Sequence, residues 1–176
     1  ATDNGTAILH LGMSGSPRIV PCTLAAENHD HVDIVLDNGD CLRLRDPRRF
    51  GALLWTREDT QKHKLLRHLG PEPLAENFRG DYLFEKSRGR KRAIRDFLLD
   101  SRVVAGIGNI YANEALFTAG LRPTRAAGRI SREQYERLAR AIRATLNRAL
   151  KAGGTTLRDF RNGRGEPGYF QLSLRV

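Results

Sequence analysis

The sequence has few cysteines and no long apolar run, and each shortage excludes a class of protein. Its 176 residues include two cysteines, Cys22 and Cys41, and five histidines that form no ligand pattern with them. A zinc site within the chain is therefore not expected, and the thiols are expected to stay reduced. No run of about 18 apolar residues or secretory leader is visible, so we expect a cytoplasmic protein without a membrane partner.

Acidic residues are also in short supply. Twenty Asp and Glu face thirty Lys and Arg, which gives a net charge of +10 and a pI near 10.4. A balance this basic favours a polyanionic partner, most often nucleic acid. A generally basic, solvated surface is the alternative. The length suits one large domain or two small ones.

The first third of the chain has the pattern of antiparallel strands. Four runs alternate or are continuously apolar, at residues 7–11, 31–36, 41–45 and 51–55. Asn38-Gly39 between the second and third runs predicts a hairpin with a type I′ turn. We therefore expect an α+β protein whose residues 1–58 form part of an antiparallel β-sandwich.

The pattern becomes helical after "LGPEPL" (69–74), which predicts a linker over 59–80 and a mostly helical domain over 81–176. Ser131 opens "SREQ", a capping box with Gln134 at its third helical position. Apolar residues then recur at helical spacing up to Gly153, which predicts an amphipathic helix of about 20 residues. The segment "FLLDSRVVAG" (97–106) is also predicted to be helical.

Two glycines precede another predicted helix, in "VAGIGNIYANEALF" (104–117). A helix N-terminus offers free N–H groups and partial positive charge, and Gly106 and Gly108 would let an anion come close. A phosphate group is the guest that suits a chain this basic. The alternative is a tight turn with Asn109 as a simple N-cap.

Two loops and a basic run carry further nucleic-acid features. Arg48 and Phe50 in "DPRRFG" suit stacking on bases and hydrogen bonding to their edges. Met13 in "HLGMSG" could wedge between base steps. The run "KSRGRKRAIR" (86–95) has six basic residues and no acidic one. The alternatives are a buried Phe50, a buried Met13 and solvated charges. A glycine-rich stretch over 153–170 reads as a long loop.

These motifs, in this order along the chain, resemble bacterial formamidopyrimidine-DNA glycosylases, which repair 8-oxoguanine. The resemblance rests on "HLGMSGSPRI", "DPRRFGALLW", "LGPEPL", "VVAGIGNIYANEALFTAG" and "GGTTLRDF…PGYF". It implies an N-terminal β-sandwich followed by a helical domain with a helix–two-turn–helix motif. It also implies a monomer that binds double-stranded DNA containing oxidised purines or abasic sites.

The resemblance implies roles at matching positions. Met13, Arg48 and Phe50 would fill the void left when a damaged nucleotide flips out, and Arg48 would bond the orphaned cytosine. Inserted side chains can offset part of the few kcal/mol that flipping costs. The DNA backbone would be contacted by His10, His29, Arg90, Arg95 and Asn109. The lesion-recognition loop, within 153–170, would use Arg158, Gly165, Gly168 and Tyr169.

The departures from the family concern its ends. The family's nucleophile is an N-terminal proline followed by a glutamate, and a C-terminal four-cysteine finger binds zinc. Neither motif is in this sequence. We therefore expect a central segment of a family member, with no catalytic residue or cofactor of its own and without the covalent activity.

Two other functions stay open at this point. A non-catalytic nucleic-acid-binding module could also carry a helix–two-turn–helix motif. A relative from the same superfamily could excise oxidised pyrimidines instead of purines. Preference for duplexes with 8-oxoguanine or an abasic site, over plain duplex or RNA, would separate these readings.

Overall fold

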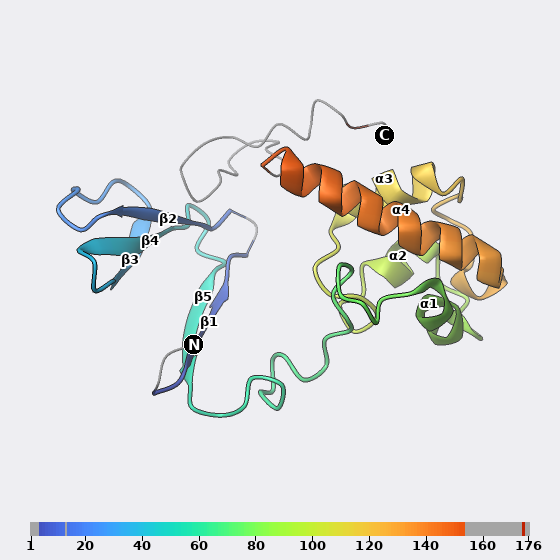
Figure 1. Cartoon of the computed structure of the whole chain (residues 1–176), viewed down its shortest axis with the longest axis horizontal. Helices are drawn as coiled ribbons and strands as arrows, with labels where there is room; N and C mark the ends of the chain where they lie inside the picture. The colour runs from blue at the N-terminus through green and yellow to red at the C-terminus, as the bar shows by residue number, and fades with distance from the viewer. Residues whose placement is uncertain (1–3, 13, 154–173, 175–176) are drawn as a thin grey trace. The chain divides into compact units, whose positions relative to one another are not determined.

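A computed structural model describes residues 4–12, 14–153 and 174 (Figure 1). The chain divides into two compact units, one containing Ala1–Lys62 and Ala152–Ser173, the other His63–Lys151 and Leu174–Val176. We call the described parts of 1–62 the β unit and residues 63–151 the helical unit. Among the described residues, no helix is long and apolar enough to cross a bilayer.

The β unit consists of two antiparallel sheets, as the sequence predicts. One sheet pairs β1 with β5, and the other has the order β2-β4-β3. The strands are β1 (Thr6–His10), β2 (Ser16–Pro21), β3 (Asp30–Val35), β4 (Asp40–Arg45) and β5 (Ala52–Thr56). Together with the helices that follow, these sheets confirm the α+β class.

The strand that the sequence did not predict is β2. Its two prolines, Pro17 and Pro21, argue against a strand in the middle of a sheet because proline has no N–H to donate. Among the described strands, β2 lies at the edge of its sheet and pairs with β4 alone. An edge strand has one side free of partners, so it tolerates proline.

The predicted hairpin is present between β3 and β4, but its predicted turn type is wrong. A type I′ turn needs positive φ at both Asn38 and Gly39, whereas only Gly39 has it, at 88°. The Leu36 amide donates to the Asp40 carbonyl at 2.9 Å, and the Gly39 amide turns back to Leu36. The connection is therefore a three-residue loop that ends on a left-handed glycine.

The helical unit is built from four α-helices around one apolar core. They are α1 (Gly80–Ser87), α2 (Ile94–Leu98), α3 (Asn109–Thr118) and α4 (Arg132–Lys151), with the short 3-10 helix η1 (Ala127–Arg129) before α4. Both α1 and α3 pack on α4. Tyr135, Leu138 and Ile142 of α4 are fully buried in this core.

Helix α4 confirms the prediction made from the capping box. The Gln134 amide donates to the Ser131 hydroxyl at 3.3 Å, and the Gln134 side chain accepts from the Ser131 amide at 3.1 Å. Gly153 follows the helix with φ of 73°, the left-handed conformation that glycine adopts without strain. Both ends of the helix were thus readable from the sequence.

The prediction of a helix over 97–106 is wrong beyond its first two residues. Helix α2 ends at Leu98, and Asp100 starts a turn instead. The Asp100 carboxylate accepts from the amide of Arg102 at 3.1 Å and from its guanidinium at 2.9 Å. An aspartate that bonds the backbone two residues ahead competes with the helix.

Part of the predicted linker packs as part of the helical unit. The Gly70 amide donates to the Ser101 carbonyl at 2.8 Å, and the Ala105 amide donates to the Pro71 carbonyl at 3.1 Å. Phe78 is 1% exposed and belongs to the core. These contacts of Gly70, Pro71 and Phe78 place the second half of the predicted linker, 59–80, within the helical unit.

Candidate nucleic-acid interface

Asp46 anchors the loop that joins β4 to β5. Its side chain is buried, and its carboxylate accepts from the Gly51 amide at 2.7 Å and from the Ser14 hydroxyl at 2.9 Å. The Gly51 amide, aided by Ser14 and opposed by burial, holds the pKa of Asp46 below its usual value. The loop is therefore held from both ends by one ionised carboxylate.

This anchor leaves the loop's tip in solvent. Arg48 is exposed and Phe50 is 56% exposed, so the alternative of a buried Phe50 is wrong. The Arg48 guanidinium lies 4.8 Å from the centre of the Phe50 ring, which is within the range of a cation–π contact. A stacked arginine and an exposed aromatic on an anchored loop can enter a base stack together.

A second loop, residues 11–15, lies against the first. The Ser14 hydroxyl also accepts from the Arg48 amide at 3.3 Å. Gly12 has φ of 61°, and a Cβ there would stand 2.8 Å from the Phe50 backbone. The two loops that the sequence singled out are thus in contact. Met13 itself lies outside the described residues.

Two histidines flank the anchored loop. His10 ends β1 opposite Ala52 and is exposed. The His29 carbonyl accepts from the Asp46 amide at 2.9 Å. His29 has φ of 76°, which is uncommon outside glycine and costs free energy. Its neighbourhood therefore holds it in that conformation beside Asp46.

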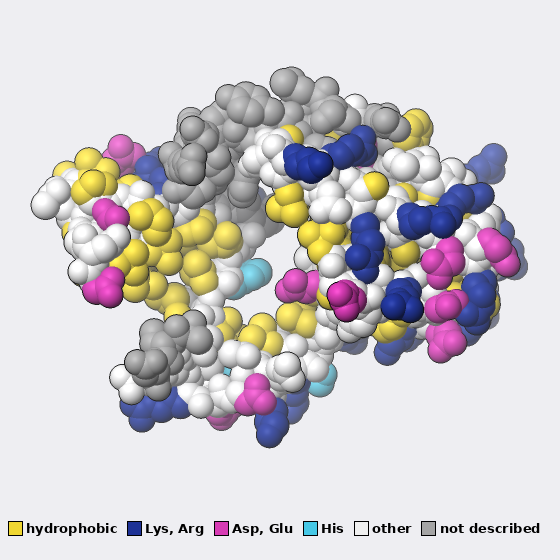
Figure 2. Space-filling model, in the orientation of Figure 1, with side chains coloured by type: hydrophobic (Ala, Val, Ile, Leu, Met, Phe, Trp, Pro, Cys, Tyr) yellow, Lys and Arg dark blue, Asp and Glu magenta, His cyan; other side chains and the backbone are white. Residues whose placement is uncertain are grey.

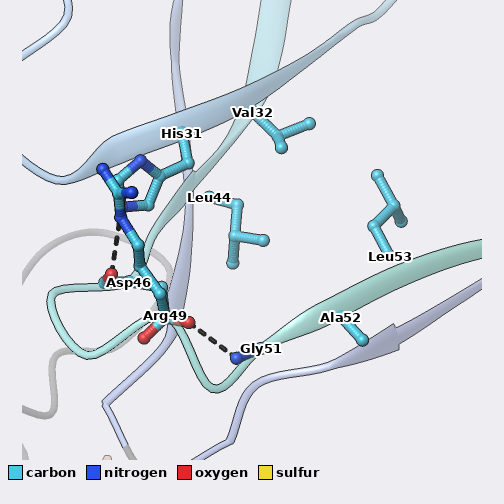
Figure 3. Close-up of a pocket in the computed structure, with 8 residues that line it drawn as sticks. All are labelled: His31, Val32, Leu44, Asp46, Arg49, Gly51, Ala52 and Leu53. Atoms are coloured by element: carbon cyan, nitrogen blue, oxygen red, sulfur yellow. Dashed lines mark hydrogen bonds between the residues drawn. The ribbon is translucent and has the colours of Figure 1, made fainter.

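A cavity of about 370 Å³ lies in the β unit next to this loop. Figure 3 shows His31 and Arg49 side by side at one end, with Val32, Leu44 and Leu53 further along the wall. His31 Nε2 lies 3.1 Å from the Asp46 carbonyl. Arg49 has φ of 55°. Positive φ therefore occurs at Arg49, three residues after Asp46, and at His29, whose carbonyl accepts from the Asp46 amide.

In the helical unit, the start of α3 is open to solvent. Gly108 is its N-cap, with φ of −99° and ψ of 177°, and α3 begins at Asn109. The alternative of Asn109 as the N-cap is therefore wrong. A Cβ built on Gly106 or Gly108 would meet nothing within 4 Å.

Packing therefore requires glycine at neither position. Gly106 has φ of 74°, so its backbone explains it. The backbone of Gly108 suits any residue, and its place at the N-cap is one where glycine is favoured. With no described atom near a Cβ at either glycine, an anion could approach the α3 N-terminus closely.

All the cations of the basic run 86–95 are exposed, but some of them also bond within the fold. Arg88 stacks on Phe84 at 3.9 Å and donates to the Ile130 carbonyl at 2.9 Å. Arg92 pairs with Asp100 at 3.2 Å. Arg90 and Arg95 are exposed, and among the described residues no hydrogen bond or ion pair links either of them to Asn109.

The remaining predicted site residues lie outside the described residues. They are Arg158, Gly165, Gly168 and Tyr169, and of the predicted loop 153–170 the structure describes Gly153 alone. Among the side chains that are described, no three His, Cys, Asp or Glu gather as metal ligands would.

Sequence reasoning missed the two residues that organise the β-unit site, Asp46 and Ser14. A signal was present, because aspartate before proline commonly opens a turn by accepting from nearby amides. Ser14 gave no comparable signal, since its contact with Asp46 spans 32 residues. Only the fold brings the two together.

Two family models match the chain. The formamidopyrimidine-DNA glycosylase N-terminal domain matches residues 1–53, and the formamidopyrimidine-DNA glycosylase H2TH domain matches residues 69–161. The chain is 57% identical over 175 residues to the formamidopyrimidine-DNA glycosylase of Idiomarina loihiensis, covering 99% of this chain and 65% of that protein. It is 61% identical to that of Halorhodospira halophila, covering 96% and 63%.

Solved structures agree with the sequence matches. The MutM (Fpg) protein of Thermus thermophilus superposes with a TM-score of 0.86 at 39% identity, over 98% of this chain and 64% of that one. Lactococcus lactis Fpg in complex with DNA containing an abasic site also gives 0.86, at 31% identity over 99% and 64%. The chain thus spans somewhat less than two thirds of these relatives, and its expected status as a central segment stays a prediction.

Proposed function

The chain belongs to the formamidopyrimidine-DNA glycosylase family, and from this premise we propose that it recognises damaged duplex DNA in base-excision repair. One observation carries the proposal: the open start of α3, where a Cβ on Gly106 or Gly108 would meet nothing within 4 Å. A DNA phosphate fits there, because the free amides and dipole of the helix favour an anion that can approach a residue without a side chain.

The helical unit would hold the DNA backbone. The Gly108 and Asn109 amides are available at the α3 N-terminus, and the exposed Asn109 side chain adds a third donor. Arg90 and Arg95 would add phosphate contacts that carry no sequence information. This unit would fix position along the duplex without choosing a base.

The β unit would recognise the missing or extruded base. Extruding a nucleotide leaves a gap in the stack and costs a few kcal/mol. Arg48 and Phe50, exposed and stacked on each other, would enter that gap from a loop anchored by Asp46. Met13 and the residues of 153–170 belong to the same proposal through the family resemblance. His10 and His29 would face the backbone beside the gap.

The activity we propose for the whole protein is excision of oxidised purines followed by cleavage of the DNA backbone. Of that activity, the described site residues supply recognition. Arginine stays protonated and has no lone pair to offer, and asparagine and phenylalanine are not amine nucleophiles. These site residues therefore supply no amine nucleophile, and we keep the expectation that the 176-residue chain binds the lesion and forms no covalent adduct.

The first test replaces Gly108 by alanine in the 176-residue chain. The new Cβ meets nothing within 4 Å, so the fold should be kept, and the melting temperature should fall only slightly because alanine caps a helix less well than glycine. Affinity for a duplex with an abasic site should fall about tenfold or more, since one misplaced phosphate contact costs about 1.4 kcal/mol. Unchanged affinity would contradict the proposed phosphate site. Gly106→Ala is the contrasting variant, and it should lose stability because φ is positive there.

The second test is sodium borohydride trapping on a duplex with 8-oxoguanine opposite cytosine. The expected result is specific binding without a trapped adduct. A trapped adduct would show that an amine of this chain attacks the sugar. The affinity for the same duplex with an oxidised pyrimidine, measured alongside, separates the two glycosylase specificities. The affinity for an RNA duplex tests the alternative of a general nucleic-acid module.

A further inference from the structure

Helix α4 presents a row of cations on the face turned away from its core contacts. Arg137, Arg140 and Lys151 are exposed, and the uncharged Ala144 and Asn147 lie between them at the same helical spacing. We call these five residues the basic stripe. Figure 2 shows dark blue Lys and Arg side chains spread over the part of the molecule where α4 lies.

The stripe's cations have no partner in the described structure. Among the described residues, no ion pair or hydrogen bond involves the side chains of Arg137, Arg140 or Lys151. Other cations of α4 are used internally, since Arg132 pairs with Asp81 and Arg143 donates to the carbonyls of Ala75 and Phe78. The stripe is thus a surface of unneutralised charge.

The acidic residues of α4 do not offset this charge. Glu133 and Glu136 both lie in the first part of the helix. Glu136 accepts from the Asp81 amide at 3.1 Å, and the Ser131 hydrogen bond holds the pKa of Glu133 below its usual value. From Arg137 to Lys151, α4 has no acidic side chain.

The stripe and the proposed phosphate site lie on different sides of α4. Helix α3 packs against α4, and the buried side of α4 includes Leu138, Ile142 and Ala149. The stripe residues lie on the opposite side of the helix. The loop before α3 lines a pocket together with Leu146 and Leu150, which lie on neither the buried side of α4 nor the stripe. A duplex held at the N-terminus of α3 and a duplex lying on the stripe would therefore contact α4 on different sides.

We propose that the basic stripe binds a second segment of duplex DNA. This inference rests on the proposed function, because it assumes that DNA is the ligand at α3. The stripe is about 21 Å long, from 14 residues at 1.5 Å each, and so spans about six base pairs of backbone charge. We choose DNA as the ligand because its charge complements the stripe, and this contact would not depend on base sequence or on damage. The contact would let the protein pass directly from one DNA segment to another during the search for lesions.

The test measures how the 176-residue chain leaves a labelled duplex of about 15 base pairs, one and a half turns, carrying an abasic site. Unlabelled undamaged duplex is added at increasing concentration. Direct transfer makes the dissociation rate rise with competitor, about tenfold for a tenfold increase, because the step is bimolecular. The variant R137Q/R140Q/K151Q should dissociate at a rate independent of competitor while keeping its equilibrium affinity for the short duplex.

The matched control neutralises three exposed cations elsewhere, as R57Q/K62Q/K64Q, and should transfer like the parent chain. The double variant R137Q/R140Q is used if the triple variant melts lower. A competitor-independent rate in the parent chain overturns the proposal. So does unchanged transfer in the stripe variant, or acceleration by polyglutamate as strong as that by DNA.

A fourth outcome would place the stripe on the same duplex as α3. In that case the stripe variant would lose three phosphate contacts to the short duplex, and the slope of log affinity against log salt would become shallower by about 2.7. That result overturns the proposal of a second segment. If the parent chain binds abasic and undamaged duplexes equally, the proposed function fails. The transfer measurement, repeated from a labelled undamaged duplex, still decides on the stripe.

Discussion

In the helical unit, twenty apolar side chains of the described residues form one core, whereas the largest fully buried side chain of the β unit is an arginine. Arg43 donates to Asp33 at 2.8 Å through two nitrogens and to the carbonyls of Leu24 and Ala25 at 2.9 and 3.0 Å. In the described β unit, the buried apolar residues are Cys41 and Leu44. One unit is held by packing and the other by a buried polar network.

The two units also present their candidate site groups differently. The helical unit offers backbone amides at the start of a helix that its core fixes in place. The β unit offers the side chains Arg48 and Phe50 on a loop that Asp46 holds. Because the same buried carboxylate joins the loop to Ser14, stability and recognition are more closely linked in the β unit. The predictions below separate the two units by these differences.

The largest effect should come from Arg43→Ala. Removing the guanidinium takes the donor from Asp33 and from two carbonyls, and it leaves the buried Asp30 with Arg18 as its remaining cation. The loss of this many contacts from a fully buried side chain should be strongly destabilising. Fluorescence of Trp55, the single tryptophan and a residue of β5, should show a lowered unfolding midpoint in urea. The helical circular dichroism signal should keep its midpoint. Equal loss in both signals would contradict separate stabilisation.

The control for this variant is Arg45→Ala. Arg45 pairs with Glu27 at 2.9 Å, but the Glu27 side chain is 67% exposed. Exposed ion pairs contribute about 0–1 kcal/mol, so the Trp55 midpoint should hardly change.

The counterpart in the helical unit is Leu138→Ala. Leu138 is fully buried, and truncating a buried leucine costs about 2–5 kcal/mol through lost burial and the cavity that remains. Here the circular dichroism midpoint should fall and the Trp55 midpoint should stay. Leu150→Ala, at a side chain 66% exposed, should leave both signals in place.

A smaller effect, on binding more than on stability, is expected from Asp46→Asn. The amide keeps the shape but loses the charge and one acceptor that serve Gly51 and Ser14. Weakening such a bond costs about 1–3 kcal/mol, so affinity for an abasic-site duplex should fall about tenfold as the Arg48 loop loosens. Asp37→Asn, on the exposed hairpin loop, should bind normally. If Asp46→Asn also binds normally, the anchor does not support recognition.

The smallest effect concerns acid stability of the helical unit. The Arg102 side chain, supported by its amide, lowers the pKa of Asp100 to about 2 from 3.8. Because the folded-state pKa is lowered, this stabilisation is present above pH 3.8 and is lost as pH falls through about 2. The circular dichroism midpoint should fall over this window. Asp100→Asn should flatten that dependence, and an unchanged slope would contradict the assignment.

The sequence predicted the helical unit's ends and faces better than its turns. Capping and apolar spacing are local signals, and they located α4 from Ser131 to Gly153. The helix predicted over 97–106 was wrong because the Asp100 side chain competes for nearby donors, which apolar spacing does not reveal. The strand β2 was missed because tolerance for Pro17 depends on an edge position that only the sheet order determines.

The candidate site was predictable where a motif carries its own geometry. Arg48, Phe50 and Asn109 stood out by residue type and neighbourhood, and the structure places all three in solvent. Asp46 and Ser14 were not identified, because they hold the loop through a hydrogen bond between residues that are 32 positions apart in the sequence. Arg88 shows the converse, since this exposed basic residue of a charged run makes its contacts with Phe84 and Ile130 of its own unit.

The most direct test of damaged-DNA recognition is the ratio of affinities for an abasic-site duplex and the same duplex undamaged. We expect the 176-residue chain to prefer the abasic duplex. Arg48→Ala should reduce that preference while leaving undamaged binding nearly intact, and Arg57→Ala, at an exposed arginine outside the loop, should keep it. Equal affinity for both duplexes in the parent chain, or an unchanged preference in Arg48→Ala, would contradict recognition through the anchored loop.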